Sequence, residues 1–154
     1  MRRNKVCGIL GIKHPILQAG IHWVSNPELV AAVSNAGGMG ILHPTAGMAH
    51  DGEPLVCLRD NIRRVQGLTR HPFGVALYLA NPNILEFIDV ITKEGVHIAV
   101  TYGGSAALHT GALKDREFIV LHQVATVRQA RGAEAQGVDI IIADGFEAGG
   151  LRGT

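Results

Sequence analysis

The sequence predicts an α/β protein built on a parallel sheet, and two observations carry that prediction. Short apolar runs alternate along the chain with longer amphipathic stretches, so that about six β/α units follow one another. The runs are rich in Val and Ile and barely alternate in polarity, which is typical of strands buried on both faces. The expected strands are His14–Gly20, Gly38–Leu42, Phe73–Leu79, His97–Tyr102, Phe118–Ala125 and Val138–Ala143.

The stretches between these runs carry the signals that begin and end helices. Asn26 precedes a proline and a glutamate, which is typical of a capped first turn. Thr126 with Gln129 indicates a capping box, and glycines follow several stretches where a helix is expected to stop. We therefore expect helices over residues 26–35, 53–69, 81–95 and 126–137, and a short helix with a loop in Ser105–Arg116.

The repeated unit leaves two architectures open, because a doubly wound sheet and a barrel are both built from it. One observation disfavours a dinucleotide-binding domain. No expected strand is followed by the glycine pattern G-x-G-x-x-G with an acidic residue about 20 positions later. We expect a single domain over residues 1–154 in either case.

Composition excludes several classes of protein. With 47% hydrophobic and 18% charged residues, the chain has the profile of a folded domain. A net charge of +1 provides no basic face for nucleic acid, and no apolar run approaches the roughly 18–20 residues of a membrane span. The histidines form no metal-ligand spacing, and no secretion signal is expected. We expect a cytoplasmic protein without a metal, nucleic-acid or membrane partner.

Four segments resemble the nitronate monooxygenase family, formerly called 2-nitropropane dioxygenases. They are Gly11–Gly20, Asn26–Leu42, Val127–Arg131 and Ala143–Gly150. The related FMN-dependent enoyl-acyl-carrier-protein reductases share the more specific of these segments. The resemblance implies a (β/α)8 TIM barrel with FMN at the C-terminal ends of its strands, and oxidation of an alkyl nitronate or nitroalkane with O2.

The resemblance also implies which residues face the cofactor. The turn after the first strand would run along the flavin ring, and Ala76 occupies the place where the family usually has an asparagine. Tyr78 lies two residues further on and points to the same side. The implied FMN-binding residues are Gln18, Ala19, Gly20, Ala76, Tyr78, Gln123, Asp144, Gly149 and Gly150. The alternatives are structural roles: a tight turn at Gly20, a core or rim tyrosine, and a solvated glutamine at the end of the fifth strand.

The expected proton acceptor is missing from the sequence. In the family a histidine follows the glycine pair and takes a proton from the α-carbon of the substrate, but this chain has Leu151 there. Because leucine cannot accept a proton, no catalytic residue is assigned, and His22 and His122 are weak candidates to replace it. Nitronates are already deprotonated, so their oxidation does not require this base.

Six expected strands fall short of the eight that close a barrel, and the phosphate site usually follows strands seven and eight. The chain would then be a piece of a longer product, a truncated gene product, or a barrel completed by association. Three functions therefore remain open: nitronate oxidation, enoyl-acyl-carrier-protein reduction, and a non-catalytic fragment that associates through open sheet edges, for instance as a homo-oligomer.

Overall fold

A computed structural model describes residues 4–48 and 52–148 of the chain. Its centre is one sheet of parallel strands in the order β1-β2-β3-β4-β5-β6, each hydrogen-bonded to its neighbour along the chain. The strands are β1 (Leu17–Gln18), β2 (Met39–Leu42), β3 (Phe73–Tyr78), β4 (Ile98–Tyr102), β5 (Ile119–Val124) and β6 (Ile140–Ala143).

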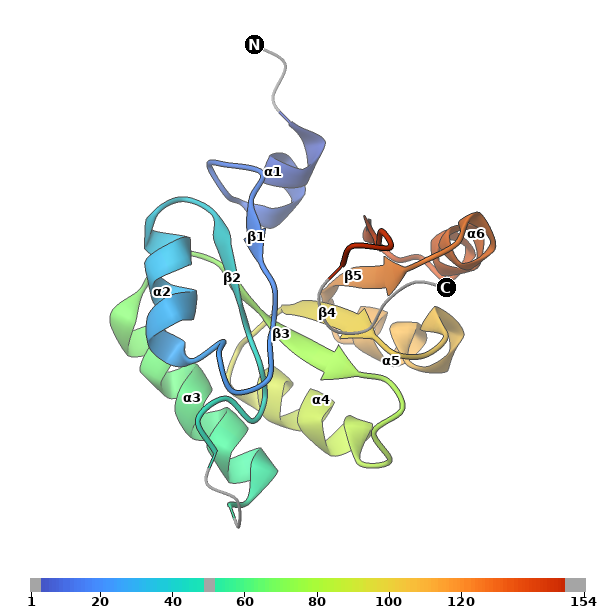
Figure 1. Ribbon diagram of the computed structural model, residues 1–154. Helices are drawn as coiled ribbons and strands as arrows, with labels where there is room; N and C mark the ends of the chain where they lie inside the picture. The colour runs from blue at the N-terminus through green and yellow to red at the C-terminus, as the bar shows by residue number, and fades with distance from the viewer. Residues whose placement is uncertain (1–3, 49–51, 149–154) are drawn as a thin grey trace.

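The strand order decides between the two architectures that the sequence left open. A doubly wound sheet reverses its order at a switch point and carries helices on both faces. Here the order never reverses, and α2 to α6 line the outside of a curved sheet (Figure 1). The described chain is therefore a half-barrel of the TIM type, whose edge strands are β1 and β6.

Helices follow the strands at the expected places. They are α1 (Lys5–Leu10), α2 (Pro27–Asn35), α3 (Pro54–Leu68), α4 (Ile84–Lys93), the 3-10 turn η1 (Ala106–Leu108), α5 (Thr110–Lys114) and α6 (Val127–Ala135). The side chain of Asn26 caps α2 by accepting from Leu29 N, and the capping box of Thr126 and Gln129 opens α6. Both N-terminal signals in the sequence are thus confirmed.

Three features of the secondary structure differ from the expectation. Helix α1 was not expected; Asn4 caps it, and its buried Leu10 packs under the sheet. The first strand is only two residues long, because Lys13 N and His14 N donate to Gly37 O and hold the preceding residues in a turn. Helix α4 begins at Ile84 rather than at Asn81, whose side chain accepts from Asn83 N in the preceding turn.

The curved sheet separates two cores, because successive side chains of a strand point to opposite faces. Val75 and Leu77 of β3 pack outward against the helices. Ala76, between them, belongs to an inner cluster with Met39 and Leu121. Helix α1 contributes to the same inner cluster and lies at the N-terminal ends of the strands (Figure 1). The opposite, C-terminal ends of the strands are therefore left for loops.

None of the helices in the described ranges is long and apolar enough to cross a bilayer.

Candidate functional site

A pocket of about 260 Å³ lies at the C-terminal ends of β2, β3 and β4. This is the end of a TIM-type barrel at which active sites lie. Its wall is mostly aromatic and small apolar, with an asparagine and two histidines. The lining residues are His22, His43, Pro44, Thr45, Ala76, Leu77, Tyr78, Asn81, Ile84, Phe87 and Tyr102. The pocket thus includes Ala76 and Tyr78, two of the expected FMN-binding residues.

Two tyrosines at the ends of neighbouring strands form one side of the pocket. Tyr78 pairs with Tyr102 in the register of β3 and β4, and their ring centroids lie 5.5 Å apart. Gly103 follows in the left-handed region, at φ +67°, and a Cβ there would overlap the Tyr78 ring. Burial, and secondarily the neighbouring Tyr78, raises the pKa of Tyr102, so its hydroxyl stays protonated at neutral pH. The pair presents an aromatic surface to the pocket.

Gly20 is required by close packing against the neighbouring strands. A Cβ on Gly20 would lie 2.6 Å from Ala76 Cβ and 3.1 Å from Ile41 Cγ2, both well inside van der Waals contact. The loop after β1 therefore lies directly on β2 and β3, and the small side chain of Ala76 permits this. The observed constraint is a contact within the protein, which agrees with the structural alternative for this glycine.

Gln18 and Ser25 fix the loop between β1 and α2. The Gln18 amide donates to Ser25 Oγ at 2.8 Å and exchanges hydrogen bonds with the backbone of Ile41. Ser25 is fully buried; its Oγ accepts from Ile21 N at 2.7 Å and donates to Ala19 O at 2.8 Å. This role of Ser25 could not be predicted, because nothing in a linear pattern reveals a hydroxyl folded back onto its own loop.

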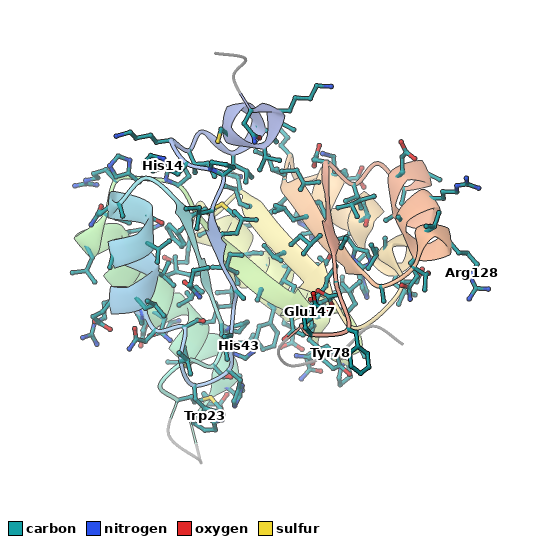
Figure 2. All side chains as sticks on the ribbon, turned by 45° about the horizontal axis from the view of Figure 1, so that its top comes forward. His14, Trp23, His43, Tyr78, Arg128 and Glu147 are labelled. Carbon is teal, nitrogen blue, oxygen red and sulfur yellow. The ribbon has the colours of Figure 1, made fainter. Side chains whose placement is uncertain are left out.

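The loop that Gln18 and Ser25 hold carries exposed side chains toward the pocket. Trp23 has φ 68°, an uncommon left-handed conformation for a residue with a side chain, and it is 56% exposed. Such strained residues cluster at functional sites, where surrounding contacts hold them in place. In Figure 2, Trp23 and His43 lie at the same end of the molecule, remote from His14.

Two histidines from different loops meet at the pocket. His22 and His43 have ring centroids 4.7 Å apart, and the His22 ring also lies edge-on to Trp23 at 4.5 Å. Thr45 Oγ1 lies between them, 3.0 Å from His22 Nδ1 and 3.2 Å from His43 Nδ1. Burial, and secondarily His22, lowers the pKa of His43 to about 4, so His43 is neutral at physiological pH. No role for His43 or Thr45 was predicted from the sequence, because their nearness to His22 depends on the pairing of β1 with β2.

His122, a candidate base from the sequence, is buried within the sheet. It is 3% exposed, and its Nδ1 lies 2.8 Å from Thr101 Oγ1 on the adjacent strand. Leu121 belongs to the inner cluster and Val120 to the outer one, so alternation turns His122 to the outer, helix-covered face. Desolvation lowers its pKa, which favours a neutral structural histidine. His122 is not among the residues that line the candidate pocket.

Gln123 and Asp144 form a second polar group at the ends of β5 and β6. Their side chains are hydrogen-bonded to each other, and Asp144 N donates to Val124 O at 2.8 Å. The structure thus brings these two expected FMN-binding residues together. Gly149, Gly150 and Leu151, the other positions singled out in this segment, lie outside the described residues.

A more open hollow of about 480 Å³ lies between the N-terminal parts of α2 and α3. Its rim carries charged side chains, including Glu28 and Arg64, which pair at 2.5 Å. None of the described residues that line it is aromatic, unlike those of the smaller pocket. We therefore take the smaller pocket as the candidate site.

Comparisons with known proteins identify a family and a fold. The family model described as nitronate monooxygenase matches residues 3–94 and 83–154. The nitronate monooxygenase of Pseudomonas aeruginosa is 32% identical over 185 positions, which cover 95% of this chain and 51% of that protein. The chain is also 32% identical, over 151 positions, to (3aS,4S,5R,7aS)-5-hydroxy-7a-methyl-1-oxo-octahydro-1H-indene-4-carboxyl-CoA dehydrogenase of Mycobacterium tuberculosis, covering 98% of this chain and 41% of that one.

A solved structure is similar over the whole chain. FabK from Thermotoga maritima superposes with a TM-score of 0.89 at 34% identity, covering 100% of this chain and 48% of that one. The chain spans about half the length of the relatives that it matches.

Proposed function

The chain belongs to the nitronate monooxygenase family, and from this premise we propose that it carries the flavin-facing half of an FMN-dependent oxidoreductase that oxidises alkyl nitronates with O2. The observation that carries the proposal is the aromatic pocket at the C-terminal ends of β2 to β4. Ligands of TIM-type enzymes bind at this end. A nitronate is a small, delocalised anion, so the substrate needs little space beside a flavin.

The residues of the pocket fit a flavin ring. Tyr78 and Tyr102 supply aromatic surfaces against which a planar ring can stack, and the small side chain of Ala76 leaves room beside them. FMN, when bound, supplies the ability to take electrons from the substrate and pass them to O2.

The remaining expected contacts are proposed to act around that ring. Gln123 would supply a donor at its edge through the amide N–H that its hydrogen bond to Asp144 leaves over, and a donor there favours negative charge on the reduced ring. Gln18 is proposed to act indirectly, because its amide is already engaged with Ser25 and Ile41 and keeps the loop containing Ala19 and Gly20 in place.

Oxygen consumption by the FMN-loaded protein with propionate 3-nitronate tests this proposal. We expect nitronate-dependent O2 uptake and no oxidation of NAD(P)H by an enoyl thioester. Absence of nitronate-dependent uptake in protein that has bound FMN would overturn it.

One observation favours a second candidate, an enzyme that acts on an acyl thioester. The alignment with the P. aeruginosa protein extends over 185 positions, although it covers only 95% of this 154-residue chain. The P. aeruginosa protein therefore has several tens of residues that have no counterpart in this chain. The alignment with the carboxyl-CoA dehydrogenase needs no such stretch. The two pieces of the family match share residues 83–94, which suggests that the extra stretch falls near α4, beside the pocket.

This shorter form supports a more open pocket that admits a longer substrate, as in the enoyl-acyl-carrier-protein reductases that the sequence also resembles. Oxidation of NAD(P)H that depends on an enoyl thioester, with none of the nitronate reaction, would establish this candidate over the first.

A further inference from the structure

The strongest unassigned feature of the site is the group formed by His22, Thr45 and His43. The loop after β1 supplies His22, and the loop after β2 supplies the other two. All three line the candidate pocket. Neither histidine corresponds to the position at which the family has its proton acceptor, because that position is Leu151 here.

Hydrogen-bond directions fix where the protons of this group lie. Thr45 N donates to His43 Nδ1 at 3.3 Å, so this nitrogen carries a lone pair. Thr45 Oγ1 lies 3.2 Å from the same nitrogen and can hydrogen-bond to it only by donating its hydroxyl proton. Because a hydroxyl has one proton, Thr45 then accepts in its contact with His22 Nδ1 at 3.0 Å. In this arrangement His22 carries its proton on Nδ1, and its Nε2 holds the free lone pair.

The surroundings keep this arrangement in place at neutral pH. The pKa of His43 is lowered to about 4 by burial, so protonation of its ring does not reverse the directions. The His22 ring is held edge-on between Trp23 and His43, while the side chain of His22 itself remains exposed. An imidazole with its tautomer fixed through Nδ1 and its Nε2 open to a pocket is the usual arrangement of a general base.

We infer that His22 is the proton acceptor of this site, taking the α-proton of a neutral nitroalkane, and that Thr45 and His43 are positioning residues that hold its tautomer. The inference rests on the proposed function. In this step the carbon–hydrogen bond breaks, the proton moves to His22 Nε2, and the electron pair stays on the substrate as the nitronate. The step needs no oxidant, so it precedes and is separable from any flavin chemistry.

The separability provides a test without cofactor. In D2O, protein without added flavin should accelerate loss of the α-proton NMR signal of nitroethane. His22→Gln should lower that rate about 100-fold, the lower range for general-base catalysis, whereas His14→Gln, an exposed histidine remote from the pocket, should leave it unchanged. Equal rates for His22→Gln and the unaltered protein would overturn the inference.

Two further measurements separate this inference from failure of the proposed function and from a structural role. The nitrogen-15 NMR shifts of His22 should show the Nδ1–H tautomer in the unaltered protein and in Thr45→Ser. In Thr45→Val they should show a mixture of the two tautomers. The Nε2–H tautomer in the unaltered protein would refute the assignment. With FMN, His22→Gln should lose oxidation of nitroethane but keep oxidation of its nitronate. If His22→Gln lost oxidation of nitroethane and of its nitronate to the same extent, a role in proton transfer would be contradicted. If the unaltered protein oxidised neither compound, that result would count against the proposed function alone.

Discussion

Single hydroxyl and imidazole groups determine the shape of the candidate site. Ser25 holds the loop of His22 through three hydrogen bonds while being completely buried. Ser25→Ala should therefore remove the hydrogen bonds that Ile21 N and the Gln18 amide donate to this hydroxyl and the one that it donates to Ala19 O, and should lower the free energy of unfolding by about 2 kcal/mol. Urea unfolding measures this change. Ser105→Ala, which removes an exposed cap, is the control and should cost clearly less; equal losses would contradict the role assigned to Ser25.

A single histidine should also make stability depend on pH. The folded-state pKa of His43 is about 4, below its ordinary value of 6.5, so the unfolded chain binds the proton more readily. The stabilisation is complete above pH 6.5 and is lost as pH falls toward 4. Partial exposure reduces the expected size to about 2 kcal/mol.

His122 should also make the folded protein less stable as pH falls, because burial also lowers its pKa. A comparison with His43→Gln isolates the contribution of His43. We expect this variant to lose about 2 kcal/mol less than the unaltered protein between pH 6.5 and 4 in chemical unfolding. Parallel stability curves for the two proteins would show that His43 is not buried as described.

At the scale of elements, two glycines should respond in opposite ways to the same substitution. A Cβ on Gly40 of β2 would lie 2.3 Å from Val30 O in α2, and backbone atoms cannot move aside. Gly40→Ala should thus force the helix off the strand and cost about 3 kcal/mol. Gly8 of α1 has nothing within 4 Å of its Cβ position, so Gly8→Ala should stabilise by up to about 1 kcal/mol. Thermal unfolding distinguishes the signs, and destabilisation by both would contradict the packing.

The elements that could be predicted are those determined by interactions between residues that are close in sequence. The capped starts of α2 and α6 and the apolar runs of β2 to β5 are confirmed. Helix caps and apolar runs are both formed by residues that are adjacent in the sequence. Helix α1 and the shortness of β1 were missed, because they depend on bonds to Gly37 and on the inner cluster, which are distant in sequence.

The candidate site divides in the same way. Ala76 and Tyr78 were predicted from strand periodicity together with the family resemblance, and both line the pocket. The grouping of His22, Thr45 and His43 could not be predicted, because it requires that two loops distant in sequence lie side by side. The sequence analysis also did not predict which face of the sheet His122 occupies, because this face depends on a single residue of register.

At the scale of the whole molecule, the described sheet leaves β1 and β6 as edges, and Ile141 of β6 is 37% exposed. Unpaired strand edges with apolar side chains favour association. We therefore expect the 154-residue chain to self-associate with increasing concentration in sedimentation velocity. A single monomeric species throughout would contradict this expectation.

The central claim is that the pocket bounded by Tyr78 and Tyr102 receives a flavin ring, and titration of FMN into the purified protein tests it most directly. Flavin fluorescence should be quenched saturably. Tyr78→Ala should weaken binding about tenfold through loss of ring stacking, whereas Val127→Ala, which trims an exposed side chain of α6, should not change it. Absence of saturable quenching, or equal FMN affinity in the unaltered protein and Tyr78→Ala, would contradict the account.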